Sequence, residues 1–179
     1  KLTKIDNDVS LLELDQEGEK VNKLATSVMK ELSQTLTSLT SSGIKCLIII
    51  SRKPKIFIAG ADIDEIKNIK TPEEAREKVN IGQSIINQIE DLPFPVIAAI
   101  HGASMGGGTE LALACDYRIA SDDPSTKIGL PETKLGILPG FGGCIRLPRV
   151  VGIQAALDII LAGKAVDSRK ALKMGLIDE

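Results

Sequence analysis

The stretch VIAAIHGASMGGGTE, residues 96–110, combines a short apolar run with a cluster of glycines and a carboxylate. Its first part, Val96–Ile100, has the length and composition of a buried β-strand, and the residues after Gly108 predict a helix. A second segment of the same design, Phe57–Ile63, also runs from apolar residues through a glycine toward a predicted helix. Two strand–glycine–helix units of this kind favour an α/β fold.

The glycines of these two segments have a chemical as well as a structural interpretation. Glycine lets another molecule approach the backbone closely, and free N–H groups at a helix start attract a negatively charged oxygen. Two such donors from separate loops that meet at one point would form an oxyanion hole. For either segment taken alone, glycines that only permit tight turns and packing remain the alternative.

Two glutamates, Glu110 and Glu132, lie close to the ends of predicted strands and the start of a predicted helix. Glu110 lies near the start of the predicted helix Thr109–Cys115, and Glu132 follows the short predicted strand Lys127–Gly129. Beside one oxyanion hole, mutual proximity and desolvation would raise the pKa of at least one carboxyl, so that one donates a proton while the other accepts. A glutamate at a helix start is also explained by the helix dipole alone, and the sequence does not show that the two carboxyls meet.

The rest of the chain alternates between predicted strands and predicted helices. Strands are expected at residues 5–14, 45–51, 57–59, 96–100, 117–120 and 127–129, and an apolar strand is expected to begin within 175–179. Helices are expected at residues 24–39, 62–67, 71–89, 109–115, 144–151 and 154–162, and a last short helix is expected to start at the cap Asp167-Ser168. Because no linker or low-complexity segment divides the chain, this alternation predicts one α/β domain with crossover connections.

Composition argues against several classes of function. The 179-residue chain has a formal net charge of −2 and 2% aromatic residues, so it lacks both the positive field and the stacking surfaces of a nucleic-acid-binding protein. Its apolar runs are far too short to span a membrane. Cys46, Cys115 and Cys144 form no CxxC pair and have no histidine cluster beside them. This spacing predicts buried, reduced thiols in a cytoplasmic protein and no metal site.

Five motifs occur in a consistent order and spacing along nearly the whole chain. They are Phe57–Ile63, Gly106–Glu110, Cys115–Ala120, Gly129–Glu132 and Pro139–Gly143. Together they resemble the crotonase (enoyl-CoA hydratase/isomerase) superfamily. The resemblance implies a superhelix of repeated ββα units and a CoA thioester substrate. It also implies hydration without a bound cofactor, since CoA is part of the substrate.

The resemblance also assigns roles to the residues of the two glycine segments. Glu110 and Glu132 match the family's two catalytic glutamates, and the backbone N–H groups of Ala61 and Gly107 match its oxyanion-hole donors. In a hydratase, Glu110 would hold and deprotonate the water while Glu132 delivers a proton to the α-carbon. These acid and base roles reverse in the dehydration direction.

Further residues would contact other parts of an acyl-CoA. The resemblance implies that the carbonyl of Ala59 accepts a hydrogen bond from the adenine amino group, and that Gly140 borders the catalytic water. Lys53 and Lys55, just before the first glycine segment, would be suitably charged partners for a CoA phosphate. A solvated pair of lysines is the favoured interpretation of these two side chains.

The segments Val21–Leu24 and Gly129–Gly136 look closest to one branch, the hydratase domain of the multifunctional α subunit of the fatty-acid oxidation complex. Residues 1–179 are accordingly predicted to be a single crotonase-like domain and an N-terminal fragment of a longer chain. That parentage implies a downstream NAD-dependent 3-hydroxyacyl-CoA dehydrogenase and a thiolase β subunit as partner. The family's C-terminal helical region, which closes the acyl pocket and builds trimers, is not matched here, so a homotrimer is less expected of this fragment.

Three alternatives compete with hydration. Gly102–Gly106 fits the G-x-S-x-G pattern of a serine hydrolase with Ser104 as nucleophile, but the only histidine, His101, precedes the serine, whereas that triad needs one after it. A double-bond isomerase of the same superfamily needs one carboxylate, so the presence of two favours hydration, alone or with isomerisation. A non-enzymatic scaffold or RNA-binding relative is disfavoured by the slight acidity and the scarcity of aromatic residues.

Overall fold

The computed structural model describes residues 1–6 and 8–179 and confirms that strands and helices alternate along the chain. The strands are β1 (Leu2–Lys4), β2 (Val9–Leu14), β3 (Cys46–Ser51), β4 (Ile56–Ile58), β5 (Val96–Ile100), β6 (Ala103–Met105), β7 (Tyr117–Ala120), β8 (Lys127–Gly129) and β9 (Ala165–Asp167). The helices are α1 (Thr26–Leu39), α2 (Ile63–Lys67), α3 (Pro72–Glu90), α4 (Gly107–Leu113), α5 (Gly143–Val151), α6 (Ile153–Ala162) and α7 (Ser168–Lys173), with the 3₁₀ helix η1 at Glu132–Leu135.

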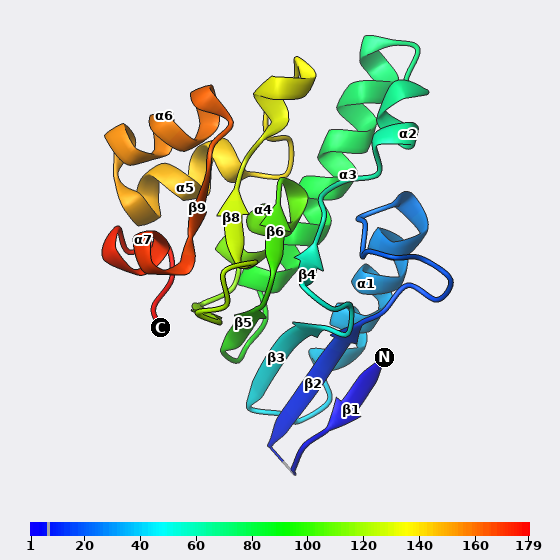
Figure 1. Cartoon of the computed structure of the whole chain (residues 1–179). Coiled ribbons are helices and arrows are strands. Elements are labelled where there is room, and N and C mark those ends of the chain that lie inside the picture. The colour runs from blue at the N-terminus through cyan, green and yellow to red at the C-terminus, as the bar shows by residue number, and fades with distance from the viewer. Residues whose placement is uncertain (7) are drawn as a thin grey trace.

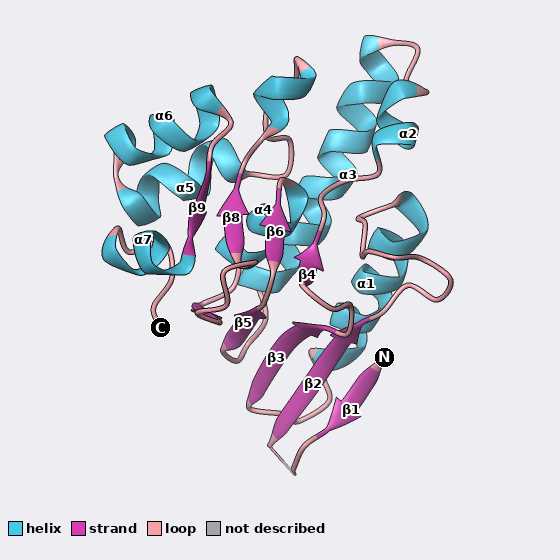
Figure 2. Ribbon diagram, viewed as in Figure 1, coloured by secondary structure: helices cyan, strands magenta, loops and turns pink. Residues whose placement is uncertain are grey.

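The strands are divided between two sheets, and from β3 to β8 successive strands join them in turn (Figure 1). In the first sheet β2, β3, β5 and β7 are parallel, and β1 adds an antiparallel edge. In the second sheet β4, β6 and β8 are parallel, and β9 is antiparallel at the edge. The pairs β3–β4 and β5–β6 are each followed by a helix, so each strand–strand–helix repeat adds one strand to both sheets (Figure 2). This is the predicted superhelix of ββα units.

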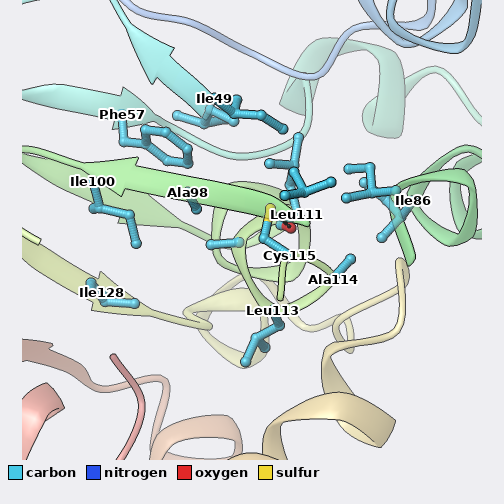
Figure 3. Close-up of a cluster of buried hydrophobic side chains, with 14 of the residues drawn as sticks. Ile49, Phe57, Ile86, Ala98, Ile100, Leu111, Leu113, Ala114, Cys115 and Ile128 are labelled. Carbon is cyan, nitrogen blue, oxygen red and sulfur yellow. Dashed lines mark hydrogen bonds between the residues drawn. The ribbon is translucent and has the colours of Figure 1, made fainter. Parts of the chain in front are cut away.

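The core is aliphatic, and it fills the space between the strands and the helices that follow them. Strand side chains alternate between two faces, which is why Leu47 and Ile49 of β3 are fully buried while Ile48 between them is partly exposed. Figure 3 shows a cluster of these buried side chains, drawn from the strands together with α3 and α4. All residues of α4 are buried, so the polar side chain of Glu110 lies inside the protein.

Two helix starts predicted from capping residues are confirmed. The Thr71 side chain accepts a hydrogen bond from the Glu74 N–H, and the Glu74 carboxylate accepts one from the Thr71 N–H, so α3 begins at a complete capping box. At α7, the Asp167 side chain accepts a hydrogen bond from the Lys170 N–H. Such caps satisfy N–H groups that have no carbonyl partner within the helix.

The opening strand predicted over Ile5–Leu14 is confirmed for Val9–Leu14, which form β2. It does not extend back to Ile5 and Asp6, and the separate strand β1 lies before them. The Asp6 carboxylate accepts hydrogen bonds from the N–H groups of Asp8 and Val9, a side-chain interaction typical of turns. Asn7, which the predicted strand included, lies outside the described residues. The strands β1, β6 and β9 were not predicted. Three residues are too few to establish an alternating pattern, although the equally short β4 and β8 were predicted to within one residue.

The expected strand within residues 175–179 was wrong. This segment is irregular, although the N–H groups of Asp178 and Glu179 donate to the carbonyl of Arg118 in β7. Leu176 and Ile177 are buried, which explains their apolar character without a strand.

The three cysteines are free, as predicted, but only Cys115 is buried. Cys46 is partly exposed and Cys144 is exposed, so the expectation of three buried thiols was wrong for these two. Cys144 stands in the first turn of α5, the helix that follows the Pro139–Gly143 motif. In the described part of the chain, no helix combines the length and the apolar character needed to cross a membrane.

Candidate active site

The two glycine segments lie side by side because β4 and β6 pair in parallel. Gly60 follows β4 with a φ of 121°, and Gly106 follows β6 with a φ of 51°, conformations that disfavour any side chain. A Cβ at Gly60 would lie 3.3 Å from the Met105 carbonyl oxygen, and a Cβ at Gly106 would lie 3.8 Å from the Gly60 Cα. Glycine therefore allows the close approach of the two segments.

Each segment also offers a free backbone donor. Gly107 is the first residue of α4, so its N–H has no acceptor within the helix. Ala61 follows Gly60 and forms a parallel bridge with Leu24, whose own N–H donates to the Gly60 carbonyl. Among the described residues, neither the Ala61 nor the Gly107 N–H donates to a protein acceptor. The geometry is thus compatible with the predicted pair of oxyanion donors.

Glu110 is almost completely buried, and two backbone N–H groups hold its carboxylate in place. One carboxylate oxygen, Oε1, accepts hydrogen bonds from the Phe141 N–H at 2.7 Å and from the Gly143 N–H at 2.8 Å. The pKa of Glu110 is raised to about 7, mainly by burial and also by the charge of Glu132, while the two N–H donors and Arg146 act in the opposite direction.

Glu132 is the first residue of η1 and is also buried. Its Oε2 atom has no hydrogen-bond partner among the described residues. Burial raises the pKa of this carboxyl above its ordinary value. A Cβ at Gly106 would lie 2.9 Å from the Glu132 Oε1, so the carboxyl rests directly against the glycine segment. An unpartnered buried carboxyl oxygen is costly and calls for a functional explanation.

Both glutamates therefore converge on the start of α4, where the two glycine segments meet. The Glu132 carboxyl rests against Gly106, the residue that caps α4, and Glu110 lies in the first turn of the same helix. With its pKa raised to about 7, Glu110 can accept or donate a proton near neutral pH, and burial raises the pKa of Glu132 in the same direction. Neighbouring N–H donors can stabilise an oxygen that becomes negatively charged.

The other predicted site residues are Ala59, Gly140 and Lys53, and their contacts differ. Ala59 is exposed at the end of β4, and its N–H donates to the Asn22 carbonyl. Gly140 directly precedes the Phe141 N–H that binds Glu110. Lys53 is neither free nor solvated, because its ammonium group forms an ion pair with Asp15 at 2.6 Å and its side chain is only 12% exposed.

The serine-hydrolase alternative finds no support in the geometry. Ser104 is fully buried within β6 rather than exposed at a strand-to-helix turn, and its hydroxyl has no partner among the described residues. The Nε2 atom of His101 lies 2.9 Å from the Lys53 carbonyl oxygen, so this histidine is engaged elsewhere.

Comparison with known proteins agrees with the geometry. The model of the enoyl-CoA hydratase/isomerase family matches residues 4–179. The chain belongs to this family. Among solved structures, the enoyl-CoA hydratase of Bacillus anthracis is 36% identical with a TM-score of 0.91, and the match covers 99% of this chain and 68% of that chain. The enoyl-CoA hydratase of Thermoplasma volcanium is 33% identical with a TM-score of 0.92, covering 100% and 70%.

The fatty acid oxidation complex subunit alpha of Aliivibrio fischeri is 49% identical over 178 residues, which are 98% of this chain and 26% of that protein. The chain thus spans about a quarter of the length of the curated relatives it matches.

Sequence reasoning missed the residues that hold Glu110 in this member of the enoyl-CoA hydratase/isomerase family. The Phe141 and Gly143 N–H groups belong to the Pro139–Gly143 motif, in which Gly140 alone was given a role from the sequence. Arg146 was not singled out in the sequence analysis. Its place, one turn into a predicted helix that follows Gly142 and Gly143, was a signal that could have marked it as a candidate site residue. Its significance depends on partners in α3, which no local pattern reveals.

Proposed function

We propose that this chain is the hydratase region of a fatty-acid β-oxidation enzyme and adds water to trans-2-enoyl-CoA, giving 3-hydroxyacyl-CoA. One observation carries the proposal: two buried carboxyls of raised pKa, Glu110 and Glu132, converge beside free N–H groups of two glycine segments. Hydration needs this combination, because a proton must leave the water while another reaches carbon and negative charge develops on the thioester oxygen.

The backbone donors act on the developing enolate. As the water oxygen bonds to the β-carbon, electrons of the double bond move toward the thioester carbonyl, whose oxygen becomes enolate-like. The N–H groups of Ala61 and Gly107 would donate to this oxygen. Losing one donor of this kind raises the barrier by about 3 kcal/mol.

The two carboxyls complete the proton balance. Two N–H groups occupy Oε1 of Glu110, which leaves Oε2 to accept a proton from the water. Glu132, whose Oε2 lacks a hydrogen-bond partner among the described residues, would deliver its proton to the α-carbon. The substrate gains one water across its double bond, and both glutamates then return to their starting protonation states by proton exchange.

The proposal extends to the rest of the substrate and to the whole protein. The Ala59 carbonyl would accept from the adenine amino group, and Gly140 would border the water. Because curated relatives are named fatty acid oxidation complex subunit alpha, we include a downstream NAD-dependent hydroxyacyl-CoA dehydrogenase and a thiolase partner in the proposal for a longer parent. Hydration itself would need only the CoA of the substrate. A cytoplasmic location stays a prediction from the free cysteines.

Hydration of a short trans-2-enoyl-CoA by this chain tests the proposal. The double variant Glu110→Gln/Glu132→Gln should fold and lose hydration, because neither glutamine exchanges a proton with water or carbon. Ser104→Ala should keep hydration, and no esterase activity should depend on it. Full hydration activity in a folded double variant would contradict the mechanism. An esterase activity that is present in the unaltered chain and lost in Ser104→Ala would instead support the serine-hydrolase alternative. A 3-enoyl-CoA substrate measures isomerisation in the same samples.

The pH dependence of hydration follows from Glu110. Its pKa of about 7 means that the carboxylate needed as base is increasingly protonated as the pH falls below this value. We expect kcat/KM to fall about tenfold per unit of pH below about 7, since the proton concentration sets the fraction of active base. Steady-state rates in buffers of constant ionic strength measure this. A rate that stays flat down to the ordinary pKa of 4.5 would contradict the assignment of Glu110 as base.

A further inference from the structure

Arg146 is a buried cation beside the candidate active site, with every side of its guanidinium group engaged. It is 8% exposed. Its Nε and Nη2 atoms form a forked pair with the two carboxylate oxygens of Glu90, at 2.9 and 2.6 Å. Nη2 also donates to the Asn87 side-chain oxygen at 2.7 Å. A planar, bidentate pair of this kind fixes orientation as well as charge.

The remaining nitrogen of Arg146 reaches the turn that binds Glu110. Nη1 donates to the Phe141 carbonyl oxygen at 3.0 Å, and the N–H of the same Phe141 donates to Glu110 Oε1 at 2.7 Å. Between the two residues, Gly142 has a φ of 109°, and a Cβ there would lie 2.0 Å from Nη1. The guanidinium group therefore occupies space that any other residue at position 142 would fill.

Helix α3 supplies the fixed side of this arrangement. Asn87 and Glu90 hold the guanidinium group, and Gln83, one turn earlier on the same helix, donates from Nε2 to the Gly140 carbonyl oxygen at 2.8 Å. The three side chains follow the spacing of one helix face. They hold the 140–143 turn at two points: Asn87 and Glu90 act through Arg146, and Gln83 binds the turn directly.

We propose that Arg146 is a positioning residue for Glu110: it anchors the 140–143 turn to α3 so that the Phe141 and Gly143 N–H groups hold one carboxylate oxygen and leave the other for water. This inference rests on the proposed function for its kinetic consequence. Its structural content, that Arg146 controls the hydrogen bonds of Glu110, stands on the contacts alone.

Several charged or titratable groups share this environment. Glu132 of η1 and Arg146 influence the pKa of Glu110, and the exposed thiol of Cys144 is near enough for both glutamates to influence it. The hydrogen bonds from Arg146 hold the pKa of Glu90 below its ordinary value, and Arg149 adds to this. Glu90 therefore stays ionised when Glu110 titrates. If the pKa of Glu110 changes when Arg146 is replaced, the change is therefore due to the loss of Arg146 and of the N–H donors, and not to titration of Glu90.

The decisive comparison uses Arg146→Lys, which keeps a positive charge but loses the fork. We expect kcat for hydration to fall about 10- to 100-fold with KM little changed, because displacing a reacting group by about 1 Å has that effect. The acid limb of kcat/KM should move to higher pH, since weaker N–H donation no longer favours the carboxylate. Glu90→Gln, which keeps the shape but weakens the fork, should change both in the same direction by less.

Arg118→Lys is the matched control. Arg118 has the same exposure as Arg146 and donates to the Cys115 and Leu176 carbonyls and to Asp178, none of which contacts Glu110. It should lose stability in urea unfolding yet keep the kcat and the pH profile of the unaltered chain. An equal kinetic change in both lysine variants, or an unchanged kcat and pH profile in Arg146→Lys, would overturn the proposal.

A measurement without substrate separates this inference from the proposed function. The Glu110 carboxyl is followed by ¹³C NMR in glutamate-labelled chain and assigned by its absence in Glu110→Gln. Its pKa should be higher in Arg146→Lys and in Glu90→Gln, and unchanged in Arg118→Lys. An unaltered chain that does not hydrate enoyl-CoA but shows these shifts would overturn only the proposed function. Absent shifts in both variants would overturn the positioning role.

Discussion

Glu110→Gln is expected to lower kcat for hydration of a short trans-2-enoyl-CoA by about a thousandfold, the range typical of removing a general base. The amide oxygen of glutamine can still accept from the Phe141 and Gly143 N–H groups, so the turn stays in place. What is lost is the second oxygen, which becomes an NH₂ group and cannot take a proton from water. Steady-state kinetics at saturating substrate measure the effect.

The same substitution should stabilise the folded chain at neutral pH. Burial raises the pKa of Glu110 from its ordinary 4.5 to about 7, so the folded chain holds this proton more tightly than the unfolded chain. Stability is therefore greatest below pH 4.5 and falls as the pH rises to about 7, by about 3 kcal/mol in total. Glutamine carries no such charge. Its stability advantage in urea unfolding should therefore be larger above pH 7 than below pH 4.5.

Glu13→Gln provides the control for both effects. Glu13 of β2 is 8% exposed and belongs to the first sheet, where it accepts from the Thr3 hydroxyl and pairs with Arg52. Its replacement should leave kcat unchanged. Glu110→Gln with undiminished kcat would contradict the role of Glu110 as base. A stability advantage independent of pH would contradict a raised pKa as its cause.

Gly102→Ala should destabilise the chain by about 3–5 kcal/mol, the range of severe backbone conflicts. Gly102 joins β5 to β6 with a φ of 65°, and a Cβ there would lie 1.8 Å from the Lys55 carbonyl carbon. Backbone atoms cannot rotate away as a flexible side chain can. The Lys55 carbonyl also accepts from the Ala103 N–H at 2.9 Å, so the collision would separate β4 from β6. Urea unfolding followed by circular dichroism measures the loss.

Gly43→Ala separates this steric conflict from backbone strain alone. Gly43 has a φ of 76°, similar to that of Gly102, but in the described chain no heavy atom lies within 4 Å of a Cβ built there. Its replacement should cost about 1 kcal/mol, the penalty for a left-handed conformation. Equal destabilisation by the two alanines would refute the close approach of Gly102 to Lys55.

Much of the fold was predictable because long elements carry local patterns. The capping box at Thr71 and Glu74 marked the start of α3, and the apolar run of β5 marked a buried strand. Short elements were predicted less consistently: β4 and β8 were found, but β6 and β9, which are also three residues long, owe their strand character to their partners. At the N-terminus, the pattern of apolar residues did not reveal the Asp6 side-chain bonds that separate β1 from β2.

The sequence by itself determined the chemistry available to this protein: two glutamates, two glycine segments and motifs of one enzyme family in order. It did so because residue type and family motifs are properties of the chain alone. Only the tertiary structure decided that Glu110 and Glu132 meet, that burial raises both pKa values, and that Arg146 fixes the turn holding Glu110. These depend on the pairing of β4 with β6 and the packing of α3 and α5 around α4, contacts between distant residues that leave no periodic trace in the sequence.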